Sequence, residues 1–190
     1  MAFALVLASG GNLRNLAALR IRHSEIAAVA LGVQILVINV VPGELPRPLA
    51  AAAHVATYLL LATFLYCNRH LPWIWAVALG GGMNFAAIAA NGGVMPASPA
   101  AMRTAGLSPA ADHFTNSGAV GDVRLAWLGD IFAVPERFPL ANVFSAGDVV
   151  LVVGAALLLR GVLHARPEDR ALAVPDAGRR GRPDDQRARW

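Results

Sequence analysis

One carboxylate in the last long apolar stretch, residues 144–163, is tightly constrained by its position. Asp148 precedes Arg160 by twelve residues, about 18 Å along a helix, whereas the hydrocarbon core of a bilayer is about 30 Å thick. Arg160 can extend its long side chain to the headgroups, but the short side chain of Asp148 cannot reach far. Asp148 must therefore be paired, hydrogen-bonded or protonated, which makes it a candidate functional residue.

A structural role accounts for Asp148 equally well. Ser145 and Asp148 have the spacing of a capping box, with Asp in place of the usual Glu. In such a box each side chain accepts a hydrogen bond from the backbone N–H of the other residue. A negative charge is also favourable at a helix N-terminus. Both interpretations stay open from the sequence.

Few other polar side chains interrupt the apolar stretches. They are Gln34, Asn39, His54, Thr57 and Asn84. Polar groups in hydrocarbon need partners, and most such residues join neighbouring helices. Gly80-Gly81-Gly82 precedes Asn84, and Gly80 and Asn84 are four residues apart, so they form a face that lets another helix approach closely. A ligand-binding kink at these glycines is the alternative.

Four apolar stretches reach or nearly reach the roughly 20 residues that a membrane-spanning helix needs. They cover residues 24–41, 49–67, 71–90 and 144–163. The composition agrees, because 56% of the residues are hydrophobic and only 15% are charged, against a usual value of about 25%. The predicted fold is an all-α membrane protein with a bundle of four transmembrane helices, its membrane domain covering residues 24–163.

The two ends of the chain differ from this domain. Residues 1–23 combine a short apolar start with a basic segment, which is either a helix on the membrane surface or a solvated linker. Residues 164–190 are rich in Arg, Pro and Gly, which predicts a disordered tail that attracts anionic lipid and has no aromatic residues interleaved for specific nucleic-acid recognition. By the positive-inside rule, both ends and the turn at residues 68–70 are cytoplasmic.

The predicted outer loop, residues 91–143, is too long for a simple connection and too apolar to be disordered. It opens with a turn motif in which glycine supports left-handed backbone and proline stops the preceding helix. The candidate binding residues of this region are Asn84, Asn91, Gly92, Gly93, Met95 and Pro96.

Several distinct short motifs are spread along most of the chain. They are Gly10-Gly11 with Leu13 and Arg20, Asn84-Phe85, Asn91-Gly92-Gly93, Met95-Pro96, Leu128-Gly129-Asp130, Phe144-Ser145 and Gly147-Asp148. This set resembles a family of small bacterial integral membrane proteins that is catalogued as a domain of unknown function. The resemblance extends to about Leu163 and implies a multi-pass protein of the bacterial cytoplasmic membrane, without naming an activity. It also implies an apolar helix before Gly10-Gly11, so residues 1–8 could be a truncated fifth helix.

A second, local resemblance concerns catalysis. Asp130 and Asp148 are placed similarly to the carboxylates of lipoprotein signal peptidases, although Ser145 stands where those enzymes have Asn and Ile131 stands where they have Arg. The resemblance implies a dyad of one ionised and one protonated carboxylate, which together activate water and protonate the leaving amine.

The leading functional prediction is not enzymatic. We expect a membrane scaffold or a protein that binds a small ligand or lipid through its outer loop. A membrane-embedded aspartyl hydrolase using Asp130 and Asp148 is the alternative, and a transport or channel component is the third. We expect no cofactor and no metal site, because Asp112-His113 with Asp122 lacks paired ligand spacing. The expected partners are the lipid bilayer and another membrane protein or a second copy of this chain.

Overall fold

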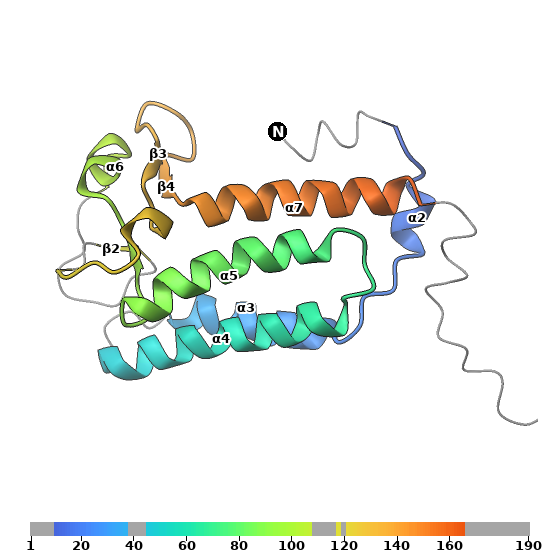
Figure 1. Ribbon diagram of the computed structural model, residues 1–190, viewed down its shortest axis with the longest axis horizontal. Helices are drawn as coiled ribbons and strands as arrows, with labels where there is room; N and C mark the ends of the chain where they lie inside the picture. Colours follow the sequence, from blue (N-terminus) through green and yellow to red (C-terminus); the bar gives the residue numbers. More distant parts are fainter. Residues whose placement is uncertain (1–9, 38–44, 108–116, 119–120, 166–190) are drawn as a thin grey trace, which may run out of the picture.

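The computed structural model describes residues 10–37, 45–107, 117–118 and 121–165. Four helices run along its long axis, namely α3 (Ser24–Ile35), α4 (Arg47–Cys67), α5 (Ile74–Ala90) and α7 (Ala146–Leu163). Figure 1 shows α5 between α7 and α4, with α3 packed against α4. A mostly helical fold is thus confirmed. Residues 166–190 of the predicted tail, the apolar start at residues 1–8, Asn39 and Asp112-His113 lie outside the described residues.

The lengths of the described helices support two of the four predicted spans and leave the other two unconfirmed. By length and composition, α4 and α7 could each cross a membrane, whereas α3 and α5 are apolar but have only 12 and 17 residues. The predicted stretch at residues 71–90 becomes helical only at Ile74, because Trp73 before it is left-handed (φ 59°). The last part of the stretch at residues 24–41 lies outside the described residues.

Three segments lie together at one end of the bundle: the basic N-terminal segment, the turn between α4 and α5, and the C-terminus of α7 (Figure 1). Asn68 is fully buried in that turn, donates from Nδ2 to Arg22 O and accepts from Arg22 N, both at 2.8 Å. The short helix α2 (Arg14–Ala17) lies against α7, where Asn15 Nδ2 donates to Leu163 O at 3.1 Å. Side-chain amides therefore tie the first described residues to the helix ends.

The closest helix pair is α5 with α7, and it is built on small residues. Gly147, Gly154 and Gly161 recur every seven residues along α7. A Cβ atom on Gly154 would lie 2.8 Å from the backbone carbon of Ala76, and one on Gly80 would lie 2.6 Å from Leu151 N. The two backbones are therefore in contact, and the packing face predicted at Gly80 is confirmed.

The segment after α5 is not a plain loop. Its described elements are β1 (Met95–Pro96), α6 (Pro99–Thr104), β2 (Ser117–Gly118), the 3₁₀ turn η2 (Ala126–Leu128), β3 (Phe132–Val134) and β4 (Asn142–Phe144). Strands β1 and β2 pair in parallel, and β3 and β4 pair antiparallel. The all-α prediction is therefore wrong here, because strands of two or three residues leave no periodic signal and depend on distant partners. These elements cover the end of the bundle opposite α2 (Figure 1).

Candidate functional site

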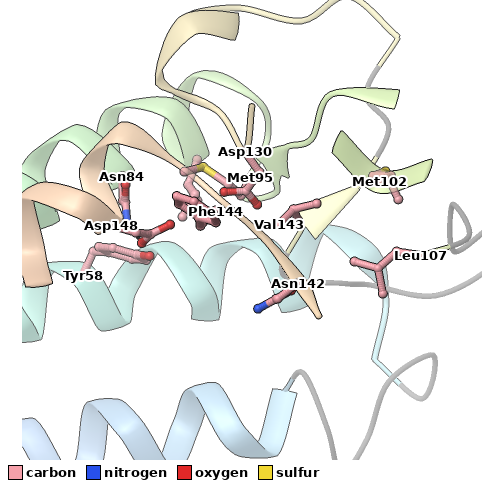
Figure 2. Close-up of a pocket in the computed structure, with 11 residues that line it drawn as sticks. Tyr58, Asn84, Met95, Met102, Leu107, Asp130, Asn142, Val143, Phe144 and Asp148 are labelled. Atoms are coloured by element: carbon pink, nitrogen blue, oxygen red, sulfur yellow. Dashed lines mark hydrogen bonds between the residues drawn. The ribbon is translucent and has the colours of Figure 1, made fainter. Parts of the chain in front are cut away.

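A pocket of about 560 Å³ lies where the strands and turns after α5 cover the ends of the long helices (Figure 2). Its polar lining comes from separate elements: Tyr58 from α4, Asn84 from α5, Asp130 from the turn before β3, Asn142 from β4 and Asp148 from α7. Apolar side chains complete the wall. The pocket has the size and mixed lining typical of small-molecule sites.

Asp148 enters the pocket from a complete capping box at the start of α7. Ser145 N donates to Asp148 Oδ2 at 2.9 Å, and Asp148 N donates to Ser145 Oγ at 3.0 Å. Ser145 is extended (φ −103°, ψ 170°), which is the ordinary backbone of an N-cap residue. The capping interpretation of Asp148 is therefore confirmed, and the same box fixes the direction of its carboxylate.

Asn84 joins that box to α5. Its Nδ2 donates to Asp148 Oδ1 at 2.6 Å, and its Oδ1 lies 2.9 Å from Ser145 Oγ, which can donate to it. Ser145 Oγ also lies 2.9 Å from Asp148 Oδ2, so its single hydrogen has two acceptors in reach. A side chain at Gly147 would collide with Asn84 Oδ1, so glycine is required for this approach. The prediction that Asn84 links helices is thereby confirmed.

Asp130 reaches the same pocket from the loop. It is buried, and its backbone extends the short parallel pairing of β1: Asp130 N donates to Pro96 O at 2.9 Å, and Ser98 N donates to Asp130 O at 3.0 Å. In Figure 2, Phe144 is drawn between Asp130 and Asp148. The two carboxylates predicted as a dyad therefore share one pocket, and the dyad itself stays a prediction.

The predicted loop motif holds the pocket together. Asn91 Nδ2 donates to Ala87 O and to Arg124 O, both at 2.7 Å, while Asn91 Oδ1 accepts from Arg124 N at 2.9 Å. Asn91 thus ties the residues before η2 to the end of α5. Pro96 acts through its carbonyl, which anchors Asp130. Of the six candidate binding residues, Asn84 and Met95 line the pocket.

Gly92 and Gly93 turn the chain from α5 toward α4 with positive φ angles of 68° and 91°. Gly93 N donates to Ile88 O at 2.9 Å, and a Cβ on Gly93 would lie 2.6 Å from the Cβ of Ala51 in α4. Gly93 O is 2.7 Å from His54 Nδ1, which must carry the hydrogen because a carbonyl oxygen only accepts. These contacts place the loop directly on α4.

The other polar residues predicted in apolar stretches also have partners. Gln34 Nε2 of α3 donates to Thr57 Oγ1 of α4 at 2.8 Å, and Thr57 Oγ1 donates to His54 O at 2.6 Å. In the described part of the chain, no buried side-chain nitrogen or oxygen atom lacks a hydrogen-bond partner. The prediction that such residues join helices holds for this pair.

Sequence reasoning missed two polar members of the pocket. Tyr58 follows His54 by four residues, so it lies on the same face of α4, and their rings meet edge to face at 5.5 Å. The four-residue spacing from His54 could therefore have identified Tyr58 from the sequence. Asn142 is an exposed residue of β4, a strand too short to predict, and carried no signal. Within the residues that the structure describes, no group of three or more His, Cys, Asp or Glu side chains could hold a metal ion.

Comparison with known proteins identifies a family and no activity. No curated protein and no solved structure matches the chain. The matched region, residues 18–160, contains Asn84, the Asn91-Gly92-Gly93 turn, Asp130 and Asp148. The match confirms the family resemblance seen in the motifs and lends no support to the one with lipoprotein signal peptidases. The chain belongs to DUF5317, a family of unknown function.

Proposed function

We propose that this chain is a multi-pass membrane protein that binds a small ligand in the pocket at the end of its helix bundle. The observation that carries the proposal is the pocket itself, because three helices and the loop each contribute a polar side chain to one apolar-walled space. The hydrogen bonds of Ser145 and Asn84 fix Asp148 in place before any ligand arrives. Such preorganisation lowers the cost of binding.

The burial pattern of the helices supports insertion in a membrane, because small or polar side chains lie inside the bundle and many large apolar side chains lie on its surface. In α4 the buried residues are Ala50, His54 and Thr57, which are small or polar. Only 17% and 22% of the apolar windows of α4 and α7 are buried inside the protein. The exposed large apolar residues of the four helices include Leu31, Leu59, Leu79, Val152 and Val153. In a membrane, lipid would cover these apolar side chains. In water, they would form a large exposed apolar surface, which soluble monomeric proteins rarely have.

The distribution of arginine supports an orientation. Arg14, Arg20, Arg22 and Arg69 belong to the end of the bundle that carries α2, and the pocket lies at the other end (Figure 1). With the end that carries α2 in the cytoplasm, the pocket opens at the outer interface. Its ligand would then come from outside the cell or from the outer leaflet.

Native mass spectrometry of the full chain, released from a mild detergent, tests ligand binding. Leu107 lines the pocket and is 39% exposed, so Leu107→Trp is expected to fill part of the space while sparing the core. Leu140 is 92% exposed and is not part of the lining, which makes Leu140→Trp the matched control. We expect a small molecule bound to the wild type and to the control but lost from Leu107→Trp. Equal occupancy in all three proteins, or none in any, contradicts the proposal.

Aspartyl hydrolysis is a second candidate, favoured by the presence of Asp130 and Asp148 in the same pocket. Two carboxylates that share a proton titrate as a pair. We therefore expect the effects of Asp130→Asn and Asp148→Asn on the pH dependence of unfolding to be non-additive if they form a dyad. Additive effects across the acid range would exclude the dyad and leave ligand binding intact.

A further inference from the structure

We infer that the pocket selects an organic cation, namely a protonated amine attached to an apolar portion. This inference rests on the proposed ligand-binding function and names the chemical class of the ligand. It follows from the charge at Asp148, the composition of the wall and the position of the mouth.

The carboxylate of Asp148 has an acceptor position that no donor in the described part of the chain fills. An ionised carboxylate can accept about four hydrogen bonds, and the described donors are Asn84 Nδ2, Ser145 N and Ser145 Oγ, which fill at most three. All three donors are neutral. The N-terminus of α7 contributes an effective charge of about +0.5, which offsets only part of a full negative charge. In its ionised form the carboxylate therefore presents net negative charge to the pocket.

Nothing basic among the described lining residues opposes that charge. The eleven lining residues include the carboxyl groups of Asp130 and Asp148 and contain no Arg, Lys or His. Tyr58 and Phe144 add aromatic rings, whose faces attract cations. In Figure 2 the hydroxyl end of Tyr58 lies beside Asp148. The two carboxylates would repel an anionic ligand here, while a cation would gain from the carboxylates and the rings.

The apolar part of the lining indicates a ligand larger than a bare ion. Met95, Met102 and Val143 are buried in the lining, whereas Leu107 and Asn142 are exposed and mark the mouth. A volume of about 560 Å³ far exceeds a single ion and suits an organic group. The charged end would reach Asp148 while the apolar portion packs against the methionines, which adapt to varied shapes.

Protection of an introduced thiol tests the inference with defined probes. In a Cys67→Ala background, Asn142→Cys places a thiol at the mouth, and Leu140→Cys places the control thiol outside the pocket. Modification by a neutral thiol reagent is followed with 2-phenylethylammonium, 2-phenylethanol or phenylacetate present. We expect the ammonium ion to protect the pocket thiol at a concentration at least tenfold lower than the alcohol requires, because a charge-assisted hydrogen bond is worth about that factor. The control thiol should be unaffected, and phenylacetate should not protect.

The variant Asp148→Asn separates charge from shape, because an amide still accepts the bonds of the capping box. We expect it to lose the advantage of the ammonium ion and to keep the protection by the alcohol. Equal protection by ammonium and alcohol in the parent protein would overturn the inference and leave ligand binding standing. If no probe protects the pocket thiol, or if that thiol never reacts, the proposal that this pocket binds a small ligand is contradicted as well. Should Asp148→Asn fail to fold, a preference for ammonium that weakens with added salt in the parent protein still supports the inference, and its absence overturns it.

Discussion

The sharpest test of the fold uses three adjacent glycines in α5. A Cβ atom on Gly80 would lie 2.6 Å from Leu151 N and 2.7 Å from Gly147 O, whereas Gly81 and Gly82 have no heavy atom within 4 Å of that position. Replacement by alanine changes helix propensity equally at Gly80 and Gly81. The difference between the two variants therefore isolates the contact between α5 and α7.

The expected magnitudes follow from two terms. Replacing glycine by alanine in a helix stabilises it by about 1 kcal/mol, and forcing a methyl group into a close-packed contact costs about 1–3 kcal/mol. Gly81→Ala should thus raise the free energy of unfolding by up to about 1 kcal/mol. Gly80→Ala should lie about 1–3 kcal/mol below Gly81→Ala. Shortening Leu151 to alanine should not rescue it, because two of the three nearest atoms belong to the backbone.

Reversible unfolding in mixed micelles, with increasing denaturing detergent, measures these differences. Trp73 and Trp75 lie at the start of α5 and report its detachment through fluorescence. Gly82→Ala provides a second control at an open position. If Gly80→Ala and Gly81→Ala unfold within about 0.5 kcal/mol of each other, the close approach of α5 and α7 is wrong, and the position of Asn84 beside Asp148 loses its basis.

Three further outcomes are expected. Asp148→Ala should destabilise the protein by about 2 kcal/mol or more, since it removes a cap and an acceptor for Asn84. Asp148→Asn should stay within about 1 kcal/mol of the wild type in the same assay, because its amide oxygen keeps the cap and the Asn84 amide can turn so that its oxygen accepts from the new amide nitrogen; equal losses would contradict the cap. Truncation from Arg170 onward should leave a monodisperse protein in size-exclusion chromatography, because that tail has little apolar surface to pack; aggregation would show otherwise. In a Cys67→Ala background, Arg180→Cys should resist an impermeant thiol reagent in intact cells, and its labelling would reverse the proposed orientation.

Local signals explain why two of the long helices were predicted closely. The predicted starts at residues 49 and 144 differ by two residues from the observed Arg47 and Ala146. Pro48 fits the first turn of α4, where its missing N–H costs nothing, and Ser145 caps α7. The start of α5 had no comparable signal, because the left-handed conformation of Trp73 depends on its surroundings.

The pocket could not be predicted as a unit because its members are distant in sequence. Asn84 and Asp148 are 64 residues apart, and each was singled out separately as a polar residue in an apolar stretch. What brings them together is backbone contact between α5 and α7, for which the glycine repeat at residues 147, 154 and 161 was a readable signal that was not used. The short strands that position Asp130 could not be predicted from the sequence, since they have only two or three residues and form by pairing with segments distant in the chain.

The two interpretations of Asp148 turn out to describe one arrangement. A carboxylate that only capped α7 would need Ser145 and water, yet Asp148 Oδ1 is held by Asn84 from another helix, in a pocket wall. A carboxylate that only served a ligand would need no capping box, yet both hydrogen bonds of the box are present. The cap holds the side chain in one direction, and that direction is into the pocket. Loss of ligand preference in Asp148→Asn with stability retained would separate these two roles experimentally.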